Sequence, residues 1–401
     1  MVKILPHLAV PVMCLLAGCS AVQRLPQLGS PGPGTLLARV LVAPACECVV
    51  GQGRPGAGKI AIGFEEFALG RHRESVVLVH NCSYDPRCEL RGLVTVSELV
   101  AGKMRPVAVD QPKWSRLSRT MMRVDDNKIA VLEVNVGQAD LGSKDSPATD
   151  CLAVLSLDGA AATQTCFPSA RTISPFGDRA DIVDGRYYFC GALLMPGSPQ
   201  EAAARAGDAH ALVLQELTIA GQLTTIDSGG SGSLCGGVVH DKQAIYWSVP
   251  EGIRRVERAD GRASTIFRPN PQQMQNPPMP LVVAGDSLLV ATFLASETSV
   301  YRIGKHADTY TRRGRPLLQR TGVGFPRMVA DERAVYVFWP DQLIRVSLAD
   351  GSSISLAEPL AEGELDQPKL LVDVTVIDDT LYYLVVDSRG PSIASIWSVG
   401  K

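Results

Sequence analysis

Aromatic residues and long apolar runs are both scarce in this sequence. Phe, Trp and Tyr together make up 5% of the 401 residues, whereas apolar residues as a whole make up 46%. A folded core must therefore be built mainly from Val, Leu, Ile and Ala. Beyond residue 18, no apolar run approaches the ~20 residues that a membrane-spanning helix requires. The composition argues against membrane-spanning helices and predicts a domain that folds in water.

An excess of one charge sign is also lacking. The chain holds 39 Lys and Arg residues against 41 Asp and Glu residues, for a formal net charge of −2. Proteins that bind nucleic acid usually carry a strong basic excess or a basic stripe. The one local basic cluster spans residues 103–119, where Trp114 lies among five Lys and Arg residues and a single Asp. We predict no nucleic-acid partner and keep Trp114 as a candidate for a binding surface.

Motifs of the common catalytic sites are missing as well. The sequence has no HExxH zinc motif and no GxSxG nucleophile elbow. Residues 53–60 approach the phosphate-binding pattern GxxxxGK[ST], but Ile60 replaces the hydroxyl residue that would ligate Mg²⁺. We therefore predict no metal site and no cofactor, and the sequence names no catalytic residue.

The N-terminus carries the most specific local signal. Lys3 is followed by an apolar stretch from Ile4 to Leu16 and then by the string Leu-Ala-Gly-Cys, which ends at Cys19. This string resembles the lipobox of bacterial lipoproteins, whose cysteine is acylated and becomes the mature N-terminus. The resemblance implies a signal peptide at residues 1–18, a palmitate-type lipid anchor on Cys19, and a place in the bacterial cell envelope. Ser20 follows where an Asp would favour the inner membrane, so the outer membrane is favoured; an ordinary secretory signal is the alternative.

The remaining cysteines predict disulfide bonds. Without Cys14 and Cys19, eight are left, at positions 46, 48, 82, 88, 151, 166, 190 and 235. An even number of cysteines in an exported chain is typical of disulfide pairing. Cys82 and Cys88 flank a turn-prone stretch of five residues and form one candidate pair. Cys190 and Cys235 are further candidates without a predicted partner.

A second pair is predicted from a hairpin. Cys151 and Cys166 lie seven residues to either side of Asp158-Gly159, a strong turn signal. A two-residue turn places the two cysteines directly opposite each other. It also assigns them to the wider, hydrogen-bonded class of cross-strand pairs, which is less suited to a disulfide.

One motif returns six times along the chain and predicts the fold. An Asp or Gly turn is followed by an apolar strand that often contains aromatic residues, as in DDNKIAVLEV from Asp125 and DERAVYVFW from Asp331. The turn aspartates recur at intervals of 45 to 58 residues, close to the period of four-stranded propeller blades. The sequence thus predicts an all-β protein, a β-propeller of four-stranded antiparallel blades. Residues 19–35, rich in Pro, Gly and Gln, are predicted to be a flexible tether, and residues 36–401 a single propeller domain.

The ends of the domain predict how the ring closes. The best-preserved repeat suggests strands at 280–284, 288–293, 299–305 and 309–315, whereas the last repeat stops at Lys401 before its fourth strand. The apolar segment that begins at Leu36 can supply that missing strand, which removes an exposed edge. With an irregular blade near residues 58–110 the count is seven; it is six if that segment is an elaboration.

The two faces of such a ring differ in their loops. Tight Asp and Gly turns, including Asp158-Gly159, Asp260-Gly261 and Asp350-Gly351, fall on one face, and we interpret them as structural. Long segments fall on the other face, where binding residues commonly lie. The candidates for this binding face are Tyr84, Arg87, Gln272, Gln275 and Trp114.

The chain as a whole resembles lipoprotein-anchored bacterial propellers. It is similar to the YWTD and NHL propellers in its turns followed by aromatic strands, although it lacks a strict YWTD string and a pyrroloquinoline-type blade motif. We predict a monomeric, non-enzymatic binding or scaffold module that uses its long-loop face to hold an envelope protein or glycan. The alternative is an exported propeller enzyme, such as a hydrolase, a lyase or a quinone-dependent dehydrogenase, with its site at the mouth of the central channel.

Overall fold

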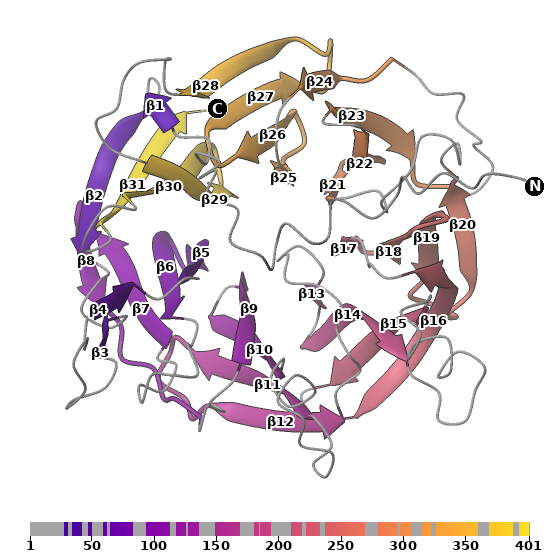
Figure 1. Cartoon of the computed structure of the whole chain (residues 1–401), viewed down its shortest axis with the longest axis horizontal. Coiled ribbons are helices and arrows are strands. Elements are labelled where there is room, and N and C mark those ends of the chain that lie inside the picture. Colours follow the sequence, from indigo (N-terminus) through magenta and orange to yellow (C-terminus); the bar gives the residue numbers. More distant parts are fainter. Residues whose placement is uncertain are drawn as a thin grey trace, which may run out of the picture.

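The computed structural model shows a ring of antiparallel sheets around one axis (Figure 1). It describes residues 28–30, 34–41, 47–49, 59–61, 65–82, 94–112, 118–125, 127–135, 149–168, 180–183, 185–193, 210–218, 222–232, 237–268, 280–294, 297–306, 315–321, 326–359, 369–387 and 393–400. Six sheets have four strands and one has five, and together they form seven blades. This confirms the predicted all-β, seven-bladed propeller.

The first four blades, numbered in chain order, run from residue 65 to residue 267. Blade 1 contains β5 (Glu65–His72), β6 (Ser75–Cys82), β7 (Val94–Val100) and β8 (Lys103–Pro106). Blade 2 contains β9 (Ser118–Asp125), β10 (Lys128–Asn135), β11 (Thr149–Ser156) and β12 (Thr163–Pro168). Blade 3 contains β13 (Ala180–Val183), β14 (Arg186–Leu193), β15 (His210–Thr218) and β16 (Leu223–Gly232). Blade 4 contains β17 (Val238–His240), β18 (Ala244–Val249), β19 (Gly252–Glu257) and β20 (Ala263–Phe267).

The last three blades include strands from the N-terminal part of the chain. Blade 5 contains β21 (Leu281–Ala284), β22 (Ser287–Leu294), β23 (Glu297–Gly304) and β24 (Leu318–Thr321). Blade 6 contains β25 (Arg327–Ala330), β26 (Ala334–Trp339), β27 (Gln342–Ser347) and β28 (Ser353–Pro359), with β1 (Leu28–Ser30) added outside β28. Blade 7 contains β29 (Lys369–Ile377), β30 (Thr380–Asp387), β31 (Ile393–Gly400) and β2 (Thr35–Leu41). A separate two-stranded sheet pairs β3 (Glu47–Val49) with β4 (Lys59–Ala61).

The ring closes as the sequence predicted. β2 pairs with β31 and becomes the outermost strand of blade 7, so a strand from the N-terminal part of the chain and the last strand share one sheet. Residues 19–35 were predicted to form a flexible tether. In the structure, β1 lies within this stretch and β2 begins at its last residue. The propeller therefore takes in part of the segment that was expected to be flexible.

The core lies between the blades, and this explains the apolar strands of the repeat. Every residue of β18 is buried, because its two faces pack against different blades. Tyr246 packs against Leu288 of blade 5, and the next residue, Trp247, packs against Leu212 of blade 3. Complete burial of side chains of this kind contributes about 1.5–3 kcal/mol each.

The turn aspartates have a clear structural role. Asp241 accepts hydrogen bonds from the amides of Gln243 and Ala244 at 2.8 and 2.9 Å, and from the Tyr246 hydroxyl at 3.0 Å. Asp331 makes the same three contacts in blade 6, to the residues two, three and five positions further on, at 2.7, 2.8 and 3.2 Å. The aspartate therefore fixes the turn and anchors the aromatic residue of the following strand.

The hairpin disulfide is confirmed, with a correction to its turn. Cys151 and Cys166 lie directly opposite each other in β11 and β12 and are bonded. Their Cα atoms are 4.0 Å apart, closer than in a wide cross-strand pair. The two-residue turn assumed from the sequence is too short, because β11 ends at Ser156 and β12 begins only at Thr163. The assignment of Cys151 and Cys166 to the wider, hydrogen-bonded class of cross-strand pairs was therefore wrong.

The other cysteine predictions are tested only in part. Cys190 is buried in β14 and is disulfide-bonded, but no bond to Cys235 is described. Cys19, Cys88 and Cys235 lie outside the described residues, as does the side chain of Cys82.

The outer strand of blade 5 corrects a second prediction. We expected it at 309–315, whereas β24 begins at Leu318 and pairs with β23. Leu317 and Leu318 pack against the core cluster between blades 5 and 6, which the polar sequence Thr-Arg-Arg-Gly-Arg cannot do.

Candidate functional site

The predicted binding residues are not placed by the structure. Tyr84, Arg87, Trp114, Gln272 and Gln275 all lie outside the described residues. So does most of the face that would carry the long loops, including segments 83–93, 136–148 and 194–209. The candidate site therefore comes from the opposite face, which carries the turns at 73–74, 101–102, 241–243 and 258–262 and is called the short-turn face below.

A pocket of about 770 Å³ opens between blades 3 and 4, at the end of the strands that carries these turns. Its floor is apolar and consists of Ile226 from β16 together with Ile245 and Val256 from β18 and β19. Ile245 and Val256 are buried, because they also belong to the core between the two blades. An apolar floor beneath a few fixed polar groups is the usual construction of a ligand site. We call this cavity the blade 3–4 pocket.

One wall of the blade 3–4 pocket is a fixed polar group of three residues. The Glu216 carboxylate accepts a hydrogen bond from Arg186 Nη1 at 3.0 Å and another from the Tyr188 hydroxyl at 2.9 Å. Burial and then the Glu216 hydrogen bond raise the pKa of Tyr188 to about 12, so its hydroxyl remains a donor at neutral pH. Arg186 is more than half exposed, whereas Glu216 is largely covered. The wall therefore presents a guanidinium to the pocket edge and holds its carboxylate inside an ion pair.

The opposite wall is formed by two turns of blade 4. Lys242 and Gln243 stand in the turn between β17 and β18, and both are exposed. Arg258 begins the turn between β19 and β20, and its Nη1 donates weakly to the carbonyls of Asp241 and Lys242 at 3.4 and 3.5 Å. These contacts link the two turns and place two cations on the same side of the pocket.

The second carboxylate of the pocket is also paired. Glu257 accepts from Arg255 Nη1 at 2.8 Å and from Arg255 Nη2 at 3.1 Å, an arrangement with two parallel contacts. Both carboxylates of the pocket lining are thus engaged by arginines, whereas Lys242 has no side-chain partner among the described residues. The charge that the pocket offers to a ligand is positive, and it lies on the Lys242 side.

The seam beneath the pocket is held by a buried ion pair. Arg254 donates to both oxygens of Asp227 at 2.6 and 2.7 Å, and the Trp247 indole donates to the same carboxylate at 2.8 Å. Asp227 belongs to blade 3, while Arg254 and Trp247 belong to blade 4. This contact fixes the two blades against each other and thereby sets the spacing of the pocket walls.

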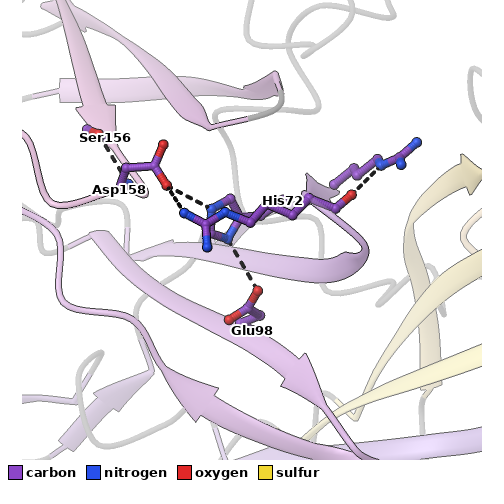
Figure 2. Close-up of polar contacts among 6 residues, drawn as sticks. His72, Glu98, Ser156 and Asp158 are labelled. Carbon is purple, nitrogen blue, oxygen red and sulfur yellow. Dashed lines mark hydrogen bonds and ion pairs between the residues drawn. The ribbon is translucent and has the colours of Figure 1, made fainter.

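A histidine cluster joins blades 1 and 2 on the same face (Figure 2). The Nδ1 atom of His72 lies 3.2 Å from Glu98, and its Nε2 atom lies 3.4 Å from Asp158, which also pairs with Arg73 at 2.7 Å. The hydrogen bond from His72 is the main cause of a lowered pKa at Asp158. Both ring nitrogens of His72 face carboxylates, so the imidazole links the two blades.

A buried carboxylate marks the innermost strands of the ring. Asp373 in β29 accepts a hydrogen bond of 2.6 Å from the Leu69 amide in β5, and Arg327 of β25 lies 3.4 Å from its other oxygen. Burial raises the pKa of Asp373 and outweighs the opposing effects of Arg327 and of the amides of Leu69 and Val374. A buried carboxyl with a raised pKa is a known mark of functional sites, although structural ion pairs show it too.

The described part of the chain lacks two further features. There, no three His, Cys, Asp or Glu side chains are arranged to hold a metal ion. The described residues also contain no helix that is long and apolar enough to cross a membrane.

Sequence reasoning passed over the pocket for a specific reason. Arg186, Tyr188, Lys242 and Gln243 belong to the repeats DGRYYF and DKQAIYW, which were interpreted as structural because their turns are regular. The signal that separates them is the residue type within the turn: blade 6 carries Glu332 where blade 4 carries Lys242. Glu216 carries no comparable signal, because nothing in its sequence context links it to a distant arginine.

The chain is similar to known proteins in its fold alone. No family model and no curated protein matches the chain. Among solved structures it is similar to the CNH domain of AfRom2, with 10% identity, 92% of this chain and 99% of that chain covered, and a TM-score of 0.48. It is also similar to apo AztD from Citrobacter koseri, with 10% identity and a TM-score of 0.45; the match covers 86% of this chain and 92% of that chain. Oligogalacturonate lyase from Vibrio parahaemolyticus is similar at 9% identity and a TM-score of 0.46; the match covers 90% of this chain and 94% of that chain. At these values the likenesses carry no information on ligand or activity.

Proposed function

We propose that this chain is a lipid-anchored β-propeller of the bacterial cell envelope that acts as a non-enzymatic binding module. In this proposal Cys19 carries the lipid, the outer membrane is the favoured location, and the protein works as a monomer with YWTD- or NHL-like repeats. The ligand is held in the blade 3–4 pocket.

The observation that carries the binding role is that other groups of the protein hold the polar side chains of the pocket walls in place. Arg186 and Tyr188 are held by Glu216, and Arg258 is held by two backbone carbonyls of the facing turn. A site whose polar groups are already positioned loses little conformational entropy on binding, which favours affinity. The apolar floor supplies the surface that a ligand would cover.

Site-specific photo-crosslinking in intact cells tests the binding role. A crosslinking residue at Ala259, on the rim of the pocket, is compared with one at Ala349, which occupies the same position of the equivalent turn in blade 6. A third position, Gln272, samples the segment predicted for the long-loop face. We expect one discrete adduct, peptide or glycan, from position 259 and none from 349. Adducts from 272 alone would move the binding role to the long-loop face, and none from any position would refute it.

The anchor has its own test. In a bacterial host, the full chain should incorporate a labelled fatty acid and sediment with membranes, and Cys19→Ser should abolish both. Release of an unlabelled wild-type chain into the soluble fraction would show an ordinary secretory signal instead.

A second candidate function is an exported propeller enzyme, and Asp373 is the observation that favours it. Burial raises its pKa, and it lies near the innermost strands, where a proton donor for hydrolysis or elimination would be needed. A screen of glycan and peptide substrates should then show turnover by the wild type and none by Asp373→Asn. Equal turnover by both proteins, or none by the wild type, speaks against this function.

A further inference from the structure

We infer that the blade 3–4 pocket recognises the free C-terminal carboxylate of a polypeptide whose last side chain is apolar. The inference rests on the proposed binding function and specifies its ligand. It is drawn from three features of the pocket: its uncompensated charge, its apolar floor and its fixed donors.

The charge balance selects an anion. The pocket lining contains the cations Arg186, Lys242 and Arg258 and two carboxylates, and each carboxylate is already engaged by an arginine. Lys242 stands exposed on the rim with no side-chain partner among the described residues. An anionic group beside Lys242 gains a charge-assisted hydrogen bond without displacing an existing pair.

The remaining surface selects the kind of anion. Ile226, Ile245 and Val256 form a continuous apolar floor, which fits a buried aliphatic side chain directly next to the anion. A sugar acid carries hydroxyl groups over its whole ring and would leave them unpaired against these residues. A phosphate group carries close to two negative charges and has no apolar side chain to cover this floor. A peptide C-terminus combines one charge with one apolar side chain, and capture of such termini is a known recognition mode.

The size of the cavity agrees with this ligand. At about 770 Å³ it admits the last few residues of an extended chain and is too small for a folded domain. The carbonyl and amide groups of the preceding residues would lie between the wall that holds Arg186 and the opposite wall that holds Gln243.

Matched peptides and variants test the inference on the full exported chain. The probes are fluorescent hexapeptides that end in Val or Leu, each made as the free acid and as the carboxamide. We expect the free acids to bind at least tenfold more tightly than the amides, because the amide loses the negative charge. Lys242→Glu, which gives blade 4 the charge that blade 6 has at Glu332, should abolish this preference. Glu332→Gln is the matched control and should leave it unchanged.

The outcomes separate this inference from the proposed function. If the free-acid and carboxamide peptides bind equally, or if Lys242→Glu retains the preference for the free acids, the pocket does not recognise the C-terminal carboxylate. If no peptide binds while position 259 still crosslinks to a glycan, the binding function stands and this ligand class is wrong. Loss of peptide binding and of the adduct at position 259 in a Lys242→Glu protein with an unchanged thermal midpoint supports the inference, since the fold is then intact.

Discussion

The carboxylate of Asp373 accepts a hydrogen bond from the backbone amide of Leu69, two residues that lie 304 positions apart in the sequence. Asp373 belongs to blade 7 and Leu69 to blade 1, so the contact closes the ring at its innermost strands, while β2 and β31 close it at the rim. A register shift between Leu371 and Asp373 interrupts the pairing of β29 with β30. Such bulges re-aim a side chain, and here the result is a carboxylate directed at the neighbouring blade.

Replacement of Asp373 by Ala should weaken this closure. The Leu69 amide would lose its acceptor and Arg327 its carboxylate, and the free energy of unfolding should fall by about 3 kcal/mol. Asp373→Asn keeps an oxygen acceptor and should lose less than half as much. Urea unfolding measures both. Asp378→Asn, on the exposed turn of the same hairpin, is the control and should change stability by less than ~0.5 kcal/mol. Equal losses for Ala and Asn would show that the hydrogen bond to Leu69 contributes little.

His80 should make the fold sensitive to acid. Its ring is buried and stacks on Phe67 at 4.7 Å, and burial lowers its pKa from 6.5 to about 4. Between these values the unfolded chain binds a proton that the folded chain does not, so stability is full above pH 6.5 and falls as the pH drops toward 4. The loss from this residue is at most about 3 kcal/mol.

Thermal unfolding at pH 7 and pH 5 checks the contribution of His80. His80→Phe removes the titrating group and keeps an aromatic ring beside Phe67, so the gap between the two midpoints should narrow. An unchanged gap would assign the acid sensitivity to other residues.

The close contact of Gly70 with blade 2 should not tolerate a side chain. A Cβ atom at this position would lie 2.2 Å from Cβ of Val124 in β9. Gly70→Ala must therefore push blades 1 and 2 apart, at a cost of about 1–3 kcal/mol. Gly400→Ala is the control, because nothing lies within 4 Å of a Cβ added there. Urea midpoints that are equal for the two variants would contradict the close contact.

Removal of the hairpin disulfide should destabilise blade 2. Cys151 and Cys166 close a loop with a sequence separation of 15 residues, for which the loss of the cross-link costs about 3 kcal/mol. The double variant Cys151→Ala and Cys166→Ala should therefore unfold at lower urea concentration than the wild type under oxidising conditions. Mass spectrometry after non-reducing digestion identifies the bonded peptides. A wild-type digest in which these two peptides are not linked would contradict the assignment.

Several local features of this fold could be predicted because they depend on neighbouring residues. Asp241 and Asp331 each bind amides two and three positions on and a tyrosine five positions on, so the pattern recurs wherever the spacing recurs. The cysteine pair followed from its symmetry about one turn. The predicted hydrogen-bonding class of that pair was wrong because the loop between β11 and β12 is longer than the two-residue turn that Asp158-Gly159 suggested.

The sequence by itself determined the repeat and thereby the four-stranded blades and the closure by the N-terminal strand, while the choice between six and seven blades was settled by the structure. A turn followed by an apolar strand is a local unit, and a strand with two apolar faces must lie between two others. Only the tertiary structure decided where a ligand can be held. Arg186, Glu216 and Lys242 meet because blades 3 and 4 stack, and Asp373 reaches Leu69 because a bulge redirects it. These contacts join residues that share no local pattern, so their geometry exists only once the ring has closed.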